Sequence, residues 1–93
     1  GNATGLTGTP AISVGNITCY SITPAAHNTY DLGSTAVRFA NIYSADLQLS
    51  NKDATPNSVD GTWGDWTLQE GEEDIFMINN RSGKKYKINL TEV

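Results

Sequence analysis

The chain has 93 residues, 38% of them hydrophobic, and a formal net charge of −4 at pH 7. It contains only 6 Lys and Arg residues, whereas binding to nucleic-acid phosphates requires clustered positive charge. No apolar run approaches the roughly 18 residues that a membrane-spanning helix needs. We therefore expect no nucleic-acid partner and no membrane insertion.

The length of the chain also limits its stability. A chain of this size buries only about 60 to 65% of the surface that its unfolded form exposes, so its own core is marginal. The single cysteine, Cys19, excludes an intrachain disulfide, and the single histidine, His27, has no second ligand-type side chain at metal spacing. We expect no metal and no cofactor. Oligomerisation is the remaining stabiliser of one small domain, or of a piece of a longer protein.

The first 24 residues predict a β stem. Residues 1–10 form a polar, glycine-rich lead-in, after which Ile12 and Val14 share one parity and Ile17 takes the other. Strand side chains alternate with period two, so each change of parity implies a bend or a change of neighbour. The pattern favours a strand that winds around an axis.

A tight turn and a short helix are expected next. Gly33 can supply the positive φ of the turn, and Ser34 is a suitable N-cap. The helix is predicted over residues 35–41, with Phe39 on its buried face. Residues 43–49 then alternate between apolar and polar side chains, which predicts a half-buried strand.

The C-terminal part predicts a three-strand antiparallel meander, with strands at 66–69, 75–79 and 86–90. The first turn, at residues 70–74, is acidic, and the second, at 80–84, is basic. The expected parts of the chain are a stem (1–24), a turn, helix and strand segment (25–50), a loop (51–64) and the meander (65–93). The expected fold class is all-β.

The stretch from Asn28 to Tyr43 reads NTYDLGSTAVRFANIY. It resembles the pattern NxYDLGSxxxRWxNIY found in bacteriophage tail fibre and tailspike proteins, with Phe39 where Trp is commoner. Residues 5–18 are similar to repeated stem segments of tail fibres from marine phages. Residues 61–93 resemble the C-terminal ends of the same proteins.

The resemblance implies a homotrimeric, β-rich fibre in the virion, attached to other tail proteins and contacting a host cell-surface receptor. In many of these proteins the segment precedes a helical intramolecular chaperone that releases itself by self-cleavage. Here a β meander follows instead, so that activity is not carried over. We expect an intertwined homotrimer without enzymatic activity. Its three chains would bury Ile12, Val14, Ile17, Leu47, Leu49, Leu68, Ile75, Met77, Tyr86, Ile88 and Leu90.

Trp63, Asp60 and Asp65 are the candidate ligand-binding residues. Trp63 lies in a glycine-flanked loop, and exposed aromatic side chains mark contact surfaces. The neighbouring carboxylates can accept hydrogen bonds from sugar hydroxyls. Trp66 shares parity with Leu68 and is expected in the core. A host glycan is the expected ligand, because loops held by a scaffold commonly carry binding.

Two other function classes remain open. A monomeric carbohydrate-binding β-module of a bacterial surface protein would bind sugars without forming a trimer. A glycan-cleaving tailspike fragment would place paired carboxylates in a groove. The acidic turn at 70–74 is open to three interpretations: a Ca²⁺ site, a salt-bridge partner for a neighbouring subunit, or a solvated turn, of which the last is expected.

Overall fold

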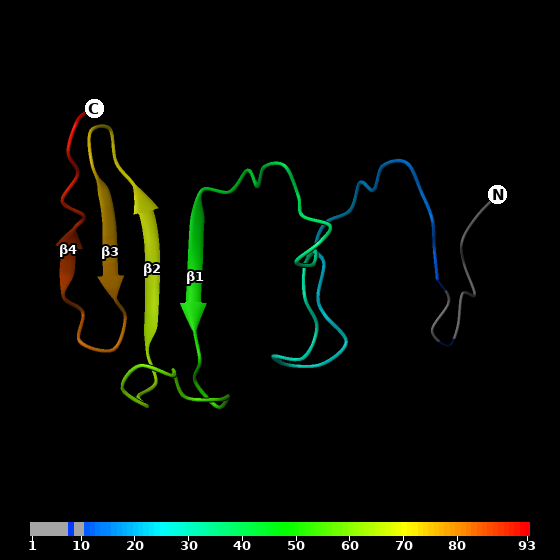
Figure 1. The fold of residues 1–93 in the computed structure, drawn as a ribbon, viewed down its shortest axis with the longest axis horizontal. Coiled ribbons are helices and arrows are strands. Elements are labelled where there is room, and N and C mark those ends of the chain that lie inside the picture. Colours follow the sequence, from blue (N-terminus) through cyan, green and yellow to red (C-terminus); the bar gives the residue numbers. More distant parts are fainter. Residues whose placement is uncertain (1–7, 9–10) are drawn as a thin grey trace. The chain divides into compact units, whose positions relative to one another are not determined.

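The computed structural model describes Gly8 and residues 11–93 (Figure 1). The chain divides into two compact units, Gly1–Tyr30 and Asp31–Val93. Apart from Gly8, the lead-in expected at residues 1–10 lies outside the described residues. The four strands found among the described residues all belong to the second unit.

In the first unit, residues 11–30 contain neither a helix nor a strand. Ile12 and Ile17 are 63% and 70% exposed. A turn forms around Asn28, where φ is +50° and the Thr29 Oγ1 donates a hydrogen bond to the His27 carbonyl. The stem strand is thus not formed within one chain. Its pairing with strands from other copies stays a prediction.

The helix predicted over residues 35–41 is wrong, because the described part of the chain contains no helix. The Ser34 N–H donates to the Val37 carbonyl oxygen at 2.9 Å, and the Val37 N–H donates to Ser34 Oγ at 3.0 Å. A helix would instead bond each N–H to the carbonyl four residues earlier. Gly33 has the predicted positive φ, at +81°. Phe39 is 59% exposed, so its predicted burial is also wrong for the single chain.

Four strands form one antiparallel sheet in chain order (Figure 1). They are β1 (Asp46–Ser50), β2 (Asp65–Glu70), β3 (Ile75–Asn79) and β4 (Lys85–Lys87). The all-β class, the strand within 43–49 and the C-terminal meander are confirmed, although β4 ends earlier than predicted. The sequence pattern did not predict that β1 pairs with β2 across the loop.

The two turns of the meander lie at opposite ends of the sheet (Figure 1), as the alternating strand directions require. In the β2–β3 turn, the Gly71 N–H donates to the Asp74 carbonyl at 2.7 Å. In the β3–β4 turn, the Asn79 N–H donates to the Lys84 carbonyl at 2.9 Å, and Gly83 takes a φ of +78°. The acidic turn and the basic turn therefore lie at opposite ends of the sheet.

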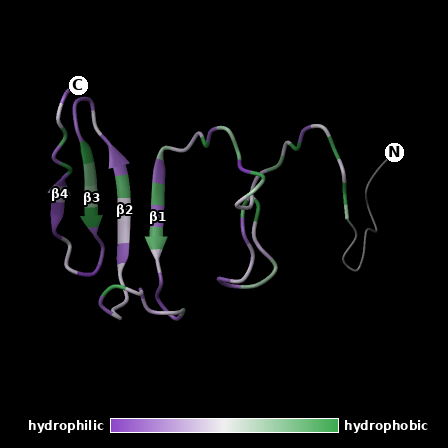
Figure 2. Ribbon diagram, viewed as in Figure 1, coloured by the Kyte–Doolittle hydropathy of each residue, from purple (hydrophilic) through white to green (hydrophobic). Residues whose placement is uncertain are grey.

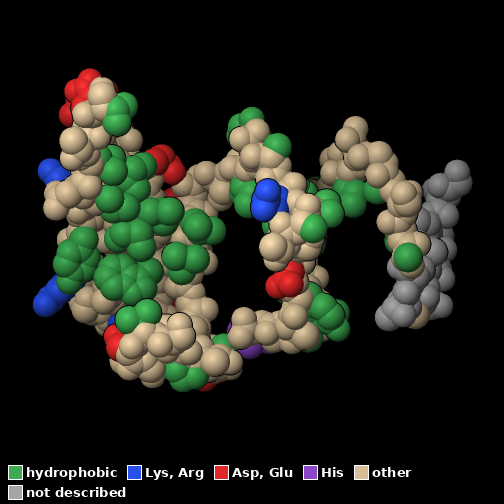
Figure 3. Space-filling model, viewed as in Figure 1, with side chains coloured by type: hydrophobic (Ala, Val, Ile, Leu, Met, Phe, Trp, Pro, Cys, Tyr) green, Lys and Arg blue, Asp and Glu red, His purple; other side chains and the backbone are tan. Residues whose placement is uncertain are grey.

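The register gathers the apolar side chains on one face of the sheet. Leu68 of β2 lies opposite Leu47 on one side and Met77 on the other, and Met77 in turn lies opposite Tyr86. Alternate residues of a strand share a face, so Leu49 and Trp66 join this row. We call this surface the apolar face: Leu47, Leu49, Trp66, Leu68, Met77 and Tyr86. Figure 3 shows hydrophobic side chains gathered over the strands.

The other face of the sheet, which we call the polar face, carries mostly hydrophilic side chains, and Figure 2 shows hydrophilic and hydrophobic residues alternating along β1. At its centre, Thr67 is 7% exposed. The Thr67 Oγ1 donates to Gln48 Oε1 at 2.7 Å and accepts from Asn80 Nδ2 at 3.0 Å. Hydrogen bonds between side chains therefore cover the centre of this face, which also carries Phe76 and Ile78 of β3.

No comparable cover exists for the apolar face. Leu47, Leu49 and Tyr86 are each 48% exposed, and no hydrophobic side chain among the described residues is buried. The Trp66 and Tyr86 rings contact each other across the face, with centroids 5.8 Å apart. A sheet normally buries its apolar face against another layer. The described part of the chain does not provide that layer.

Candidate ligand-binding loop

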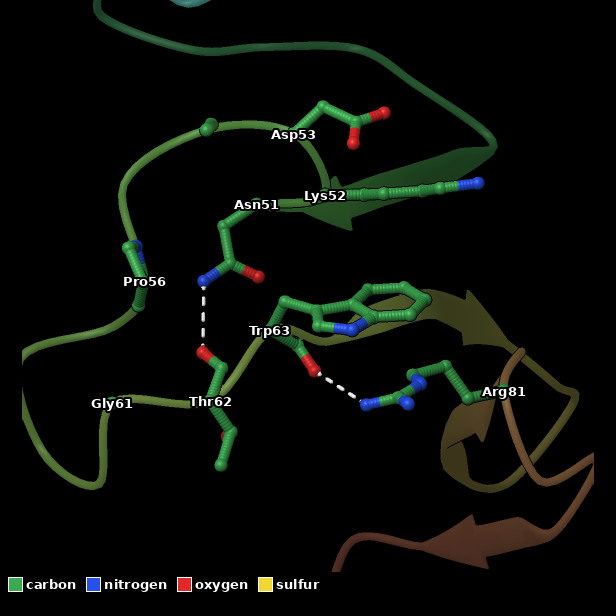
Figure 4. A pocket seen from close by; sticks show the side chains of 9 residues that line it. Asn51, Lys52, Asp53, Pro56, Gly61, Thr62, Trp63 and Arg81 are labelled. Atoms are coloured by element: carbon green, nitrogen blue, oxygen red, sulfur yellow. Dashed lines mark hydrogen bonds between the residues drawn. The ribbon is translucent and has the colours of Figure 1, made fainter.

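Asn51 closes the base of the loop between β1 and β2. The Gly64 N–H donates to Asn51 Oδ1 at 2.7 Å, and the Asn51 N–H donates to the Gly64 carbonyl at 3.4 Å. Figure 4 shows the Asn51 side chain reaching across the loop to the Thr62 carbonyl, a hydrogen bond of 3.1 Å. The two strand ends are thus joined by one side chain, and the 51–64 loop leaves the sheet as an ordered unit.

Asn57 and Asp60 organise the tip of the loop. Asn57 Oδ1 accepts hydrogen bonds of 2.9 Å from the N–H groups of Val59 and Asp60. Asp60 Oδ1 accepts from Asn57 Nδ2 at 2.6 Å, from Thr62 Oγ1 at 2.7 Å and from the Thr62 N–H at 3.1 Å. Such local side-chain bonds stabilise turns in place of regular secondary structure.

The same bonds act on the charge of Asp60. Hydrogen bonds from Thr62, and then from Asn57, favour the carboxylate and lower the pKa of Asp60 below its ordinary value of 3.8. All three bonds end on Oδ1, and Oδ2 accepts none of them. Asp60 is therefore an ionised acceptor whose orientation is set by the loop.

Trp63 lies between two cations. The Cζ of Arg81 is 3.7 Å from the centroid of the indole ring, and the Nζ of Lys52 is 5.9 Å from it. Figure 4 shows the two side chains on opposite sides of the ring. Arg81 Nη1 also donates to the Trp63 carbonyl at 3.0 Å. Arg81 therefore stacks directly on the ring, whereas the Lys52 ammonium approaches the ring less closely.

The surface around Trp63 is hollowed. One hollow, of about 620 Å³, is lined by Asp60, Trp63 and Arg81, together with Trp66. A second hollow is lined by Trp63, Arg81 and Lys52. Small-molecule sites typically occupy about 300 to 1,000 Å³. Two of the predicted site residues, Asp60 and Trp63, therefore line one hollow of suitable size.

Asp65 does not line either of these hollows. It is the first residue of β2 and pairs with Ser50, so its side chain follows the strand alternation onto the polar face. There its Oδ1 accepts a hydrogen bond of 3.1 Å from Asn80 Nδ2. The structure therefore separates Asp65 from Asp60 and Trp63.

Sequence reasoning missed Arg81 and Lys52 as partners of Trp63. Arg81 is separated from Trp63 by 18 residues and reaches the ring because the β3–β4 turn lies beside the loop. Asn79 holds that turn, since its Oδ1 accepts from the Arg81 N–H at 2.9 Å. The Asn and Gly residues of the β3–β4 turn predicted the position of the turn in the sequence. No local pattern indicates that this turn packs against the 51–64 loop.

Neither a cluster of metal-ligating side chains nor a membrane-spanning helix occurs among the described residues. No group of three or more His, Cys, Asp or Glu side chains within them is placed to hold a metal ion. Over the same part of the chain, no helix has the length and apolar character to cross a bilayer.

No family model, no curated protein and no solved structure matches the chain. Its function has to be inferred from its own residues and their arrangement.

Proposed function

We propose that the chain is a non-enzymatic structural and host-adhesion module of a bacteriophage tail fibre, and that it works as an intertwined homotrimer in the virion. The observation that carries this proposal is the uncovered apolar face of the sheet, where Leu47, Leu49 and Tyr86 are each 48% exposed. A four-stranded sheet of one layer needs packing on its apolar face to be stable. Further copies of the chain supply that packing.

The energy available from association is substantial. Full burial of a Leu or Met side chain contributes about 1.5 to 3 kcal/mol relative to full exposure. Leu47 and Leu49 are half exposed in the single chain, so complete burial adds roughly half of that amount for each. The gain is repeated across the apolar face and in every copy.

The N-terminal half of the chain supports the same proposal. Residues 11–45 form no strand in the single chain, and the side chains of Ile12, Ile17 and Ile22 in this segment are all more than half exposed. Strands of an intertwined stem find their hydrogen-bond partners in other chains. The segment from Asn28 to Tyr43 also carries the tail-fibre resemblance.

For host adhesion we propose the 51–64 loop, with a cell-surface glycan as its ligand. Trp63 would contact a sugar ring in the hollow that Asp60 also lines, and Asp60 would accept hydrogen bonds from its hydroxyl groups. Asp65 would contribute only to a ligand that extends onto the polar face. Three copies of a weak site can raise avidity by roughly 10² to 10⁴ without new contacts.

Light scattering on the purified chain tests the central part of this proposal. We expect the mass of three chains of 10.0 kDa each at micromolar concentration. A folded monomer under these conditions would contradict it. A monomer that binds sugars would favour a carbohydrate-binding β-module of a bacterial surface protein, and turnover of a bacterial polysaccharide would favour a glycan-cleaving tailspike fragment.

A further inference from the structure

One row of side chains across the polar face has opposite charges at its two ends. Asp46 of β1 pairs with Gln69 of β2, Gln69 pairs with Phe76 of β3, and Phe76 pairs with Lys87 of β4. The four residues therefore stand at one level of the sheet. A carboxylate lies at the β1 edge of this row and an ammonium at the β4 edge.

The direction of the two edge strands matches this distribution of charge. Neighbouring strands are antiparallel and there are four of them, so β1 and β4 run in opposite directions. When two copies stand side by side around an axis parallel to the strands, the β4 edge of one copy meets the β1 edge of the next. The two edges then run antiparallel, and residues of one row remain at the same level.

Edge-to-edge contacts between identical edges do not pair opposite charges. In full antiparallel register, two β4 edges would bring together the ammonium groups of Lys85 and Lys87, and two β1 edges would place Asp46 opposite Ser50, without a cation. A head-to-tail contact instead places Lys87 opposite Asp46. It also covers both open edges, which a face-to-face pair of sheets would leave exposed.

We propose that the occupant of the apolar face is a ring of further copies of this chain, joined head to tail. In this ring the apolar faces turn inward, and the β4 edge of each copy lies beside the β1 edge of the next, with Lys87 opposite Asp46. The number of copies, three, rests on the proposed function. The order of the edges rests on the register and charge of the sheet alone.

Disulfide trapping tests the edge contact directly. Directly opposite residues of antiparallel strands have Cα atoms about 4.5 to 5.5 Å apart, which a disulfide can span. The chain that carries both Asp46→Cys and Lys87→Cys, in a Cys19→Ser background, should oxidise to a covalent trimer on a non-reducing gel. The matched controls are the two single-cysteine variants. Each should remain monomeric on the gel, because a head-to-tail ring never brings two equivalent positions together.

The outcomes separate the edge order from the number of copies. Covalent dimers of either single-cysteine variant would overturn the head-to-tail order, as would a double variant that stays uncrosslinked while light scattering gives a trimer. In the second case the proposed trimer would stand. A covalent species of two chains, with the matching mass in solution, would support the edge order and refute the trimer of the proposed function.

Charge reversal provides an independent test. In its own chain, Lys87 borders a surface hollow that Glu73 and Asp74 also line. The effect of reversing the charge of Lys87 alone therefore does not identify Asp46 as its partner. Lys87→Glu should weaken association by roughly two- to fivefold at each interface, the range for an exposed ion pair. Addition of Asp46→Lys to the same chain should restore it. A double variant weaker than Lys87→Glu alone would argue against the proposed contact.

Discussion

The stack of Arg81 on Trp63 fastens the candidate loop to the rest of the sheet. Arg81→Ala removes both the contact at 3.7 Å and the hydrogen bond of 3.0 Å to the Trp63 carbonyl. A hydrogen bond with a charged donor contributes about 1.5 to 3 kcal/mol, and an exposed cation–π contact about 0.5 to 1 kcal/mol. Because Trp63 is 37% exposed, water weakens both, and we expect a loss of about 1 to 2 kcal/mol in the free energy of unfolding.

A double-mutant cycle isolates the ring contact. Trp63→Ala removes the indole but keeps the backbone carbonyl that Arg81 bonds, so the coupling between the two substitutions reports the stack alone, about 0.5 to 1 kcal/mol. Urea unfolding followed by circular dichroism, at one fixed chain concentration, measures it. Lys52→Ala is the matched control, because its Nζ lies 5.9 Å from the centroid and should couple less. Additive effects of the Trp63 and Arg81 substitutions, within about 0.3 kcal/mol, would refute the stack.

Three further predictions concern the ligand site and the turns. Trp63→Ala should abolish binding to host-cell polysaccharide in a glycan-array assay without changing the mass in solution. The control Tyr20→Ala, at an exposed position of the other unit, should leave binding intact. Equal binding by the unsubstituted chain and both variants would show that the site lies elsewhere. The pKa of Asp60 is lowered in the folded chain, so its stabilisation of the loop is present above pH 3.8 and lost as the pH falls through the lower folded value. Amide exchange in the loop should accelerate there, and an unchanged acid response in Asp60→Asn would contradict this role. Gly71→Ala should destabilise the β2–β3 turn by about 1 kcal/mol, because its Cβ would come within 2.6 Å of the Phe76 ring; an unchanged urea midpoint would show that the ring moves aside freely.

Several parts of the fold could be predicted from the sequence because they depend on neighbours in the chain. Side chains along a strand alternate between its two faces, so an alternating pattern of apolar and polar residues predicted the positions of β1 and of the meander. The positive φ at Gly33 was predicted because glycine has no Cβ atom. Trp63 was predicted as a ligand-binding residue from its place in a glycine-flanked loop.

The helix expected over residues 35–41 shows where local reasoning fails. The spacing of apolar residues suits one face of a helix, but a helix of two turns is marginal in water unless that face packs against something. Phe39 is 59% exposed, so no such packing exists in the single chain. The Ser34 side chain bonds the Val37 N–H and stabilises a turn instead.

The candidate site depended on tertiary structure still more. Asp65 lies two residues after Trp63 in the sequence, yet the strand alternation directs it to the polar face, where Asn80 bonds it. Arg81 lies 18 residues away from Trp63 and yet stacks on the ring. Sequence by itself determined the class of the fold and the positions of its strands, because both follow from local periodicity. Only the pairing of β1 with β2 and the packing of the β3–β4 turn decided which side chains meet, because these contacts join residues that no local pattern relates.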